Sequence, residues 1–502
     1  MRYDVAPGAT ASSPRAAARP SLVALHSKTG RALIAATALA STVGFLNATA
    51  VNVVVPAIGR DLGMGMAALH WALTGYLVSA AALLLLSGAL ADRFGRRGVL
   101  KAGLLVILAA SIACATAPSI GVLIGARLAQ GAGAALVIPS GLALLYGTLC
   151  DRDRARGIGA WAGLATLGGT VGPYVAGWLV EHASWRWLFA LNLPLILAAL
   201  FALRGVPEAD AAHRPLRLDV RGAMLAVIGI GGVSYALIDG AASGWINPGV
   251  IAAASLGTVS LMALLPVERH APAPMLPLSL FASRQFSAVN VTTILFYGAL
   301  SAASYLLVLQ LQLQLGYSAS QAGAALIPQA AAFVVVSPLS GGLVVRIGPR
   351  WPTATGILIV SAAFLWLSSA HVGTSYTTGI LPSVVLLGLG LGLAVGPLTA
   401  ATLADISDTD LGEASAVNSA ASQLGGVMAI ALVPALIGGG AISLADALTD
   451  GFQPAMIVLA AVCAASAVIS ALFVAAERAQ APRVLPPLAH PGCAIPVAGA
   501  AA

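Results

Sequence analysis

The feature that most constrains this chain is a series of fourteen apolar stretches, each near the length of about 20 residues that a helix needs to cross a bilayer. Only 9% of its residues are charged, against about 25% in soluble globular proteins. We therefore expect an all-α polytopic membrane protein with 14 transmembrane helices. The predicted spans are residues 32–56, 68–91, 98–117, 120–148, 157–180, 187–203, 219–238, 247–267, 286–311, 321–345, 352–370, 378–403, 415–437 and 453–474.

The distribution of Lys and Arg predicts the orientation of these helices. With a cytoplasmic N-terminus, 22 of the 25 basic residues fall in cytoplasmic segments or at the cytoplasmic ends of spans, two (Arg60 and Arg186) fall in outer loops, and Arg127 alone lies deep within a span. Cytoplasmic loops of membrane proteins carry such an excess. We expect both termini in the cytoplasm and a location in the cell membrane. The net charge of +7 follows from this bias, so no nucleic-acid partner is predicted.

The loop after the second span concentrates unusual residues, reading Gly-Ala-Leu-Ala-Asp-Arg-Phe-Gly-Arg-Arg over residues 88–97. Asp92 lies at the predicted C-terminal end of a helix, where the macrodipole disfavours an anion, so we expect it to have a partner. The loop resembles the signature loop of the major facilitator superfamily. That resemblance implies a cytoplasmic gate, with Asp92 meeting the N-terminus of the thirteenth span. The gate residues would be Gly88, Asp92, Arg93, Gly95, Arg96 and Arg97. For the arginines, the alternative is that they only fix topology.

A similar decapeptide, Gly-Gly-Leu-Val-Val-Arg-Ile-Gly-Pro-Arg, follows 253 residues later at residues 341–350, with Val345 in place of the aspartate. This repeat predicts two related six-helix halves, the architecture of facilitators, with the seventh and eighth spans as an inserted pair. The predicted domains are a disordered cytoplasmic tail (1–31), the N-terminal half (32–203), the inserted pair with its linkers (204–285), the C-terminal half (286–474) and a second disordered cytoplasmic tail (475–502).

Arg127 in the fourth span is a candidate functional residue, because an arginine in mid-membrane costs about 2.5–3.5 kcal/mol on insertion scales. Gln130 follows three residues later and shares its helix face. The stretch resembles the superfamily's Arg-x-x-Gln-Gly-x-Gly motif, which implies a role for the arginine in proton transfer. The alternative is a structural role, hydrogen bonding across helices.

The first span contains Leu-Asn-Ala-Thr-Ala-Val-Asn-Val-Val-Val-Pro at residues 46–56. It resembles a motif of the fourteen-span drug:proton antiporter branch, and Asn52 matches that motif. Asn47, however, stands where the branch places a membrane carboxylate implied in coupling. An amide cannot titrate, and all eighteen acidic residues fall in predicted loops, tails or span ends. By helix rise Asn47 and Arg127 lie at similar depth, about 10–14 Å below the outer surface. We hypothesise that Asn47, Arg127 and Gln130 face one another across a central cavity.

The fifth span carries Gly168, Gly172, Pro173 and Gly177. The spacing resembles the antiporter motif Gly-x-x-x-Gly-Pro-x-x-Gly-Gly, with Ala176 in place of one glycine, and this favours export over import. Glycine lets helices approach closely and proline kinks them, so we predict a hinge or a tight packing site. The alternative is ordinary glycine-rich packing. After this span, residues 184–194 hold Trp185 and Trp187, which we interpret as interfacial anchors.

These features predict a secondary transporter that exports small amphipathic compounds such as drugs or antibiotics by alternating access, coupled to protons. It is not expected to be an enzyme, and we predict no cofactor or metal. The partners expected are the small-molecule substrate, the proton and the lipid bilayer, with the protein a monomer. Neither lysine follows a glycine, so no P-loop supports an ATP-driven pump. Because Asn47 replaces the carboxylate, an uncoupled facilitator or uptake permease remains the alternative.

Overall fold

The computed structural model describes residues 23–63, 66–207, 219–271, 276, 278–404, 406, 411–438 and 444–474. Within these residues the regular elements are helices, apart from one isolated bridge between Val23 and Leu149. The predicted all-α class is confirmed. Both predicted tails fall largely outside the described residues.

The N-terminal half places one helix, or a collinear pair, at each of its predicted spans. Ala50 joins α1 to α2 with helical backbone angles (φ −68°, ψ −28°), so the two together occupy the first span. The helices are α1 (Lys28–Thr49), α2 (Val51–Leu62), α3 (Met66–Phe94), α4 (Arg96–Ala115), α5 (Ile120–Thr148), α6 (Asp151–His182), α7 (Arg186–Ala190) and α8 (Asn192–Leu203).

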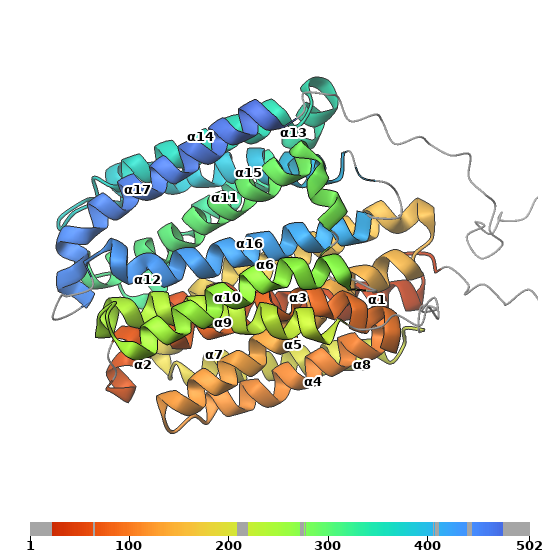
Figure 1. The fold of residues 1–502 in the computed structure, drawn as a ribbon, viewed down its shortest axis with the longest axis horizontal. Coiled ribbons are helices and arrows are strands. Elements are labelled where there is room, and N and C mark those ends of the chain that lie inside the picture. The colour runs from red at the N-terminus through yellow and green to blue at the C-terminus, as the bar shows by residue number, and fades with distance from the viewer. Residues whose placement is uncertain are drawn as a thin grey trace, which may run out of the picture.

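The rest of the chain supplies α9 (Val220–Ser243), α10 (Pro248–His270) and the C-terminal half. That half consists of η1 (Leu278–Ala282), α11 (Arg284–Leu309), η2 (Gln310–Gln314), α12 (Ala319–Ala324), α13 (Ile327–Ile347), α14 (Arg350–Leu367), η3 (Tyr376–Ile380), α15 (Leu381–Leu403), α16 (Leu411–Leu436) and α17 (Leu444–Phe473). In Figure 1 α14, α15 and α17 lie in the upper part of the bundle, and α4, α5 and α8 lie in the lower part.

The internal repeat has a structural counterpart in two glycines. Gly95 joins α3 to α4 with φ +86°, and Gly348 joins α13 to α14 with φ +78°. Side chains other than glycine rarely adopt such angles. The two positions are 253 residues apart, the same offset as the repeated decapeptide.

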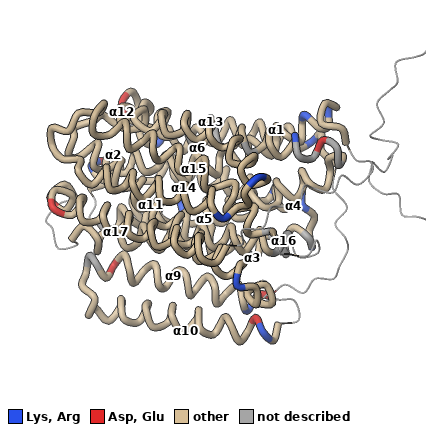
Figure 2. Tube along the Cα trace, turned by 90° about the horizontal axis from the view of Figure 1, so that it is seen from above, with Lys and Arg blue, Asp and Glu red and all other residues tan. Residues whose placement is uncertain are grey.

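Twelve helices in the described part of the chain are long and apolar enough to cross a membrane. α3 adds a shorter apolar run, Ala68–Leu84, and α6 is not among the twelve. The protein is a multi-pass membrane protein, while the number fourteen stays a prediction. Figure 2 shows most charged residues near the two ends of the bundle, as expected for helices that cross a membrane.

The inserted helices α9 and α10 run along one edge of the bundle (Figure 2). They approach each other closely, since a Cβ atom added at Gly232 would lie 2.8 Å from the carbonyl oxygen of Ala253. α9 packs against α3 and α16, so the pair contacts both halves. Trp71 Nε1 on α3 donates to Asp239 Oδ2 on α9 over 3.1 Å. α9 extends beyond its predicted end, and Asp239 is the second-last residue of the candidate span Val220–Gly240, so this carboxylate lies at a span end, as predicted.

Candidate functional site

The candidate site is built around the buried guanidinium of Arg127, whose residue is 1% exposed. Its Nε atom donates to the carbonyl oxygen of Ala72 at 3.0 Å, and Nη2 donates to the carbonyl oxygens of Leu73 at 3.5 Å and Asn47 at 3.2 Å. Nη1 donates to Gln130 Oε1 at 3.0 Å. Every one of these acceptors is a neutral carbonyl or amide oxygen. Asn47 lies near the junction of α1 with α2, three residues before Ala50.

Aromatic rings complete the environment of the guanidinium. Its central carbon lies 4.7 Å from the centroid of the Tyr76 ring and 6.0 Å from that of Phe189. The Tyr76 hydroxyl donates to the carbonyl oxygen of Gly44 at 2.9 Å, which ties α3 to α1. Cation–π attraction grows when the cation is desolvated, so these rings partly offset the cost of burying a charge.

A chain of polar side chains extends from Gln130. Its Nε2 donates to Ser111 Oγ on α4 at 2.9 Å, and Asn192 Nδ2 on α8 lies 3.1 Å from both Ser111 Oγ and Asn47 Oδ1. Asn47 Nδ2 donates back to the carbonyl oxygen of Val43 at 2.8 Å. Asn47, Ser111, Gln130 and Asn192 are at most 1% exposed. The chain therefore links four helices, α1, α4, α5 and α8, through buried hydrogen bonds.

The structure brings Asn47, Arg127 and Gln130 together, but not in the predicted manner. The guanidinium contacts the main-chain carbonyl of Asn47, while the side chain of Asn47 bonds to Asn192. All three residues are buried inside the N-terminal half and are not exposed to a central cavity. The guanidinium turns inward because its acceptors are main-chain carbonyls of α1 and α3. Asn52 makes none of these contacts, and in the described structure its buried Oδ1 has no hydrogen-bond partner.

Sequence reasoning missed Ser111 and Asn192. A serine in an apolar helix carries little signal. Asn192 lay in the stretch interpreted as an interfacial anchor, and that interpretation needs a correction. Trp187 is 59% exposed, as an anchor should be, but Trp185 is 3% exposed and donates from Nε1 to Asp61 Oδ2 at 2.9 Å. Hydrogen bonds from Trp185 and Arg186 hold the pKa of Asp61 below its ordinary value.

The gate loop brings two arginines onto the ends of neighbouring helices. Arg96 Nη1 donates to the carbonyl oxygen of Ala143 near the end of α5 at 2.9 Å, and Arg97 Nε donates to that of Leu203, the last residue of α8, at 3.2 Å. Cations are favoured at helix C-termini, so these residues do more than fix topology. Arg93 is exposed, with its guanidinium 5.3 Å from the Phe94 ring centroid. Gly88 and the side chain of Asp92 lie outside what the structure describes.

The glycines of the fifth span form two contacts on α6. A Cβ added at Gly172 would meet Leu46 Cδ1 of α1 at 3.2 Å, and one at Gly168 would collide with Thr42. A Cβ added at Gly177 would collide with the backbone of Ala319 on α12. A Cβ added at Gly323 of α12 would likewise lie 2.5 Å from the carbonyl oxygen of Pro173. The structure therefore has a tight packing site here, between helices of one half and between the two halves.

Further contacts join the halves near this point, which we call the predicted outer end because it holds the loops assigned to the outside. Glu181 of α6 accepts hydrogen bonds of 2.6 Å from both the backbone nitrogen and the hydroxyl of Ser320. Gln312 Nε2 donates to the carbonyl oxygen of Val53 at 3.0 Å. One continuous buried apolar cluster includes residues from both halves, among them Val54 of α2 and Leu306 of α11.

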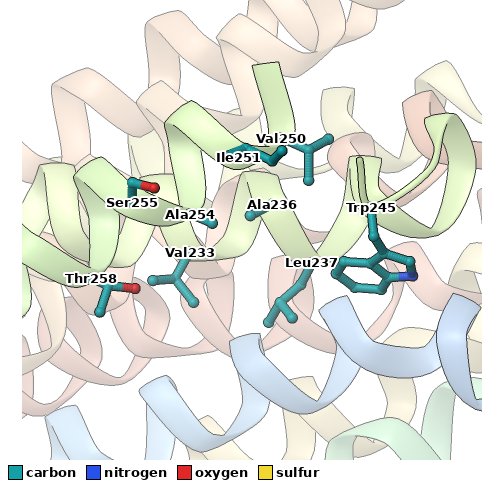
Figure 3. Close-up of a pocket in the computed structure, with 9 residues that line it drawn as sticks. All are labelled: Val233, Ala236, Leu237, Trp245, Val250, Ile251, Ala254, Ser255 and Thr258. Carbon is teal, nitrogen blue, oxygen red and sulfur yellow. The ribbon is translucent and has the colours of Figure 1, made fainter. Parts of the chain in front are cut away.

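Two cavities lie away from the arginine. One, of about 140 Å³, is in the C-terminal half and is lined by hydroxyl and amide groups of Tyr297, Thr399, Thr402, Ser415, Asn418, Ser419 and Ser422. The other, of about 250 Å³, is an apolar groove between α9 and α10 that Trp245 borders (Figure 3). In the described part of the chain no cluster of three His, Cys, Asp or Glu residues could hold a metal ion.

The sequence profile of the Major Facilitator Superfamily matches residues 37–430 and, in a second overlapping match, 289–491. The chain belongs to the Major Facilitator Superfamily. A facilitator of this kind is a membrane transporter and not an enzyme, and the arginine network is part of a transport protein.

Relatives of this facilitator carry names of resistance and export proteins. It is 32% identical over 80% of its length to the multidrug resistance protein Stp of Mycobacterium tuberculosis, covering 75% of that protein. It is 32% identical to the methylenomycin A resistance protein of Bacillus subtilis and 31% identical to the cephamycin export protein CmcT of Amycolatopsis lactamdurans. Each of these two alignments covers 91% of this chain and 97% of the relative.

Solved structures agree on the fold. A peptide transporter POT crystallised with sulfate aligns with a TM-score of 0.66 at 17% identity, over 90% of this chain and 98% of that one. At that identity the likeness shows the facilitator fold alone.

Proposed function

We propose that this facilitator exports small amphipathic compounds, antibiotics among them, by alternating access, in exchange for protons. It would work as a monomer in the cytoplasmic membrane with both termini in the cytoplasm. The observation that carries the direction of transport is the pair of relatives named for methylenomycin resistance and cephamycin export, which match 91% of the chain.

The contact between α6 and α12 supports alternating access. Two glycines, Gly177 and Gly323, let the backbones of the two halves touch. At these two points backbone meets backbone, so the halves can separate there without disengaging side chains, while the buried apolar cluster shared by both halves has to part as well. The remaining bonds, such as Glu181 to Ser320, are short surface contacts that water can replace. On the opposite side the gate loop with Asp92 is proposed to act as the latch.

Arg127 supports this cycle as a positioning residue. Arginine keeps its proton in proteins, and four hydrogen bonds to neutral acceptors already hold this guanidinium. We therefore assign it the task of holding α1, α3 and α5 as one rigid body, rather than that of carrying the proton. If this rigid body were broken, movement at the contact between α6 and α12 would no longer be transmitted to the cytoplasmic gate loop.

The polar cavity in the C-terminal half is the proposed part of the substrate path. Asn418 Nδ2 donates to Thr293 Oγ1 at 2.9 Å, and hydroxyls of Ser415, Ser419 and Ser422 lie along the same face of α16. Tyr297 adds an aromatic surface. Hydroxyls and one aromatic ring suit compounds that combine apolar bodies with hydrogen-bonding groups.

One observation keeps a second function in view. The side chain of Asn47 is an amide whose hydrogen bonds are to Val43 and Asn192, so the position that carries the carboxylate in the antiporter branch cannot titrate. An uncoupled facilitator or uptake permease would need no such group. Coupling by protons therefore requires a titratable group elsewhere.

Growth of cells with and without the gene in a panel of toxic amphipathic compounds tests the direction of transport. Export predicts better growth, with less accumulation inside the cell, for at least one compound. Greater sensitivity and greater accumulation in cells that carry the gene would support the uptake permease instead. The Arg127→Gln variant, if it reaches the membrane, should behave like cells without the gene.

A further inference from the structure

A short segment of α3, from His70 to Leu73, touches three parts of the molecule. The ring of His70 meets the ring of Tyr305 on α11, with centroids 5.5 Å apart and planes at 85°. Trp71 donates to Asp239 of the inserted pair. The carbonyls of Ala72 and Leu73 accept from Arg127. Four consecutive residues thus join the C-terminal half, the inserted pair and the arginine network.

His70 lies in the interface between the two halves, which we call the seam; here α3 meets Tyr305 of α11. His70 is 0% exposed, and so is Tyr305, whose hydroxyl has no hydrogen-bond partner in the described structure. Tyr305 belongs to the apolar cluster that also contains Leu73 and Val54 of the N-terminal half. The seam therefore closes around an imidazole, the only side-chain type whose unperturbed titration falls between about pH 5 and 8.

We propose that His70 is the proton-binding site through which the acidity outside the cell opens this seam; the inference rests on the proposed proton coupling and assigns its site. The step is the binding of one proton to the unprotonated ring nitrogen, which gives an imidazolium and changes no other bond. A charged ring without access to water is unfavourable in an apolar seam. Protonation therefore favours the conformation in which the halves separate at the predicted outer end and water reaches the ring.

The neighbouring charges agree with this assignment. Arg127 lies close by and carries a second positive charge, which opposes a further cation in the closed seam. Two carboxylates on helices packed against α3 have partners already: Asp61 accepts from Trp185 and Arg186, and Asp239 accepts from Trp71. The titratable and charged groups on the helices packed against α3, and on α11, are Lys28, Arg31, Arg60, Asp61, Arg96, Arg97, Lys101, Cys114, Arg127, Tyr146, Arg221, Tyr235, Asp239, Arg284, Tyr297, Tyr305 and Glu413.

Hydrogen–deuterium exchange of the full chain in lipid nanodiscs tests the proposal without a known substrate. Exchange would be compared between about pH 8 and about pH 5.5, on either side of the histidine range, after correction for the intrinsic pH dependence of exchange. The wild type should exchange several-fold faster at the lower pH in peptides that cover the start of α3 and α12. His70→Gln and His70→Asn should lose that response, and His70→Arg should exchange fast at both pH values.

The matched control is His371→Gln, an exposed histidine in a loop predicted to lie at the same end, which should keep the full response. An unchanged pH response in both His70→Gln and His70→Asn would overturn the proposal. So would hydrogen exchange of the wild-type α3 and α12 peptides that does not differ between the two pH values. These outcomes are distinct from a failure of the proposed function. Gradient-driven uptake by wild-type vesicles tests the coupling itself, and it could succeed while His70 proved irrelevant.

Discussion

Arg127 donates a hydrogen bond to the main-chain carbonyl of Asn47 over 3.2 Å, while the side chain of Asn47 turns away to Asn192. The two residues that sequence resemblance associates with coupling are therefore connected through the backbone of α1. Replacing the side chain of Asn47 need not break that bond, whereas replacing Arg127 must.

Arg127→Lys is expected to abolish transport and to lower the free energy of unfolding by about 1–3 kcal/mol, because lysine keeps the charge but cannot reproduce the planar fork of donors. Thermal unfolding in detergent measures the stability. Arg204→Lys is the matched control, since Arg204 is exposed at the end of α8. Equal stability of both variants would contradict the assigned positioning role.

Asn47→Asp should introduce a titrating group into the polar network that contains the guanidinium. The new carboxyl keeps the contact with Asn192 but, when ionised, loses the donor that now serves the carbonyl of Val43. We expect the unfolding free energy to fall by about 1–3 kcal/mol and transport to gain a new dependence on pH. A transport profile identical to that of the wild type would show that this position has no influence on coupling.

Gly177→Ala should wedge the halves apart at the predicted outer end. The added methyl group would collide with the backbone of Ala319, which cannot move without α12. Faster hydrogen exchange in α12 and reduced transport are expected. Gly163→Ala on the same helix meets no atom within 4 Å and should be neutral or slightly stabilising, because alanine favours helix by about 1 kcal/mol. Similar behaviour of the two variants would argue against the glycine contact as a closure.

Glu181 provides a pH test in a different range from His70. Burial raises its pKa, but hydrogen bonds from Ser318 and Ser320 outweigh this, and the pKa is lowered from its ordinary 4.5. A lowered pKa means that the contribution to closure is complete above about pH 4.5 and is lost as the pH falls through the lower folded value. Exchange of α12 should therefore rise again in strong acid. Glu181→Gln should remove that second rise and leave the response of His70 intact.

Much of this fold could be predicted because bilayer crossing leaves a strong signal in composition. Arg127 and Gln130 were identifiable because polar groups are costly in a membrane, and the depth of Asn47 followed from helix rise. Asn192 could not be placed beside Asn47, since the two are 145 residues apart and the sequence around either residue does not indicate the contact. Asp239 lies at the end of a span, as predicted, but its partner Trp71 could not be foreseen because the two are 168 residues apart. The contact of His70 with Tyr305 was equally unpredictable, since it is made by a helix far along the chain.

The most direct test of the account is substrate uptake into everted membrane vesicles, using a compound that the growth panel identifies. In such vesicles the cytoplasmic face is outside, so an acidic interior should drive accumulation of the compound, and collapse of the proton gradient should release it. Uptake of the same rate and extent with and without the gradient would contradict proton-driven export.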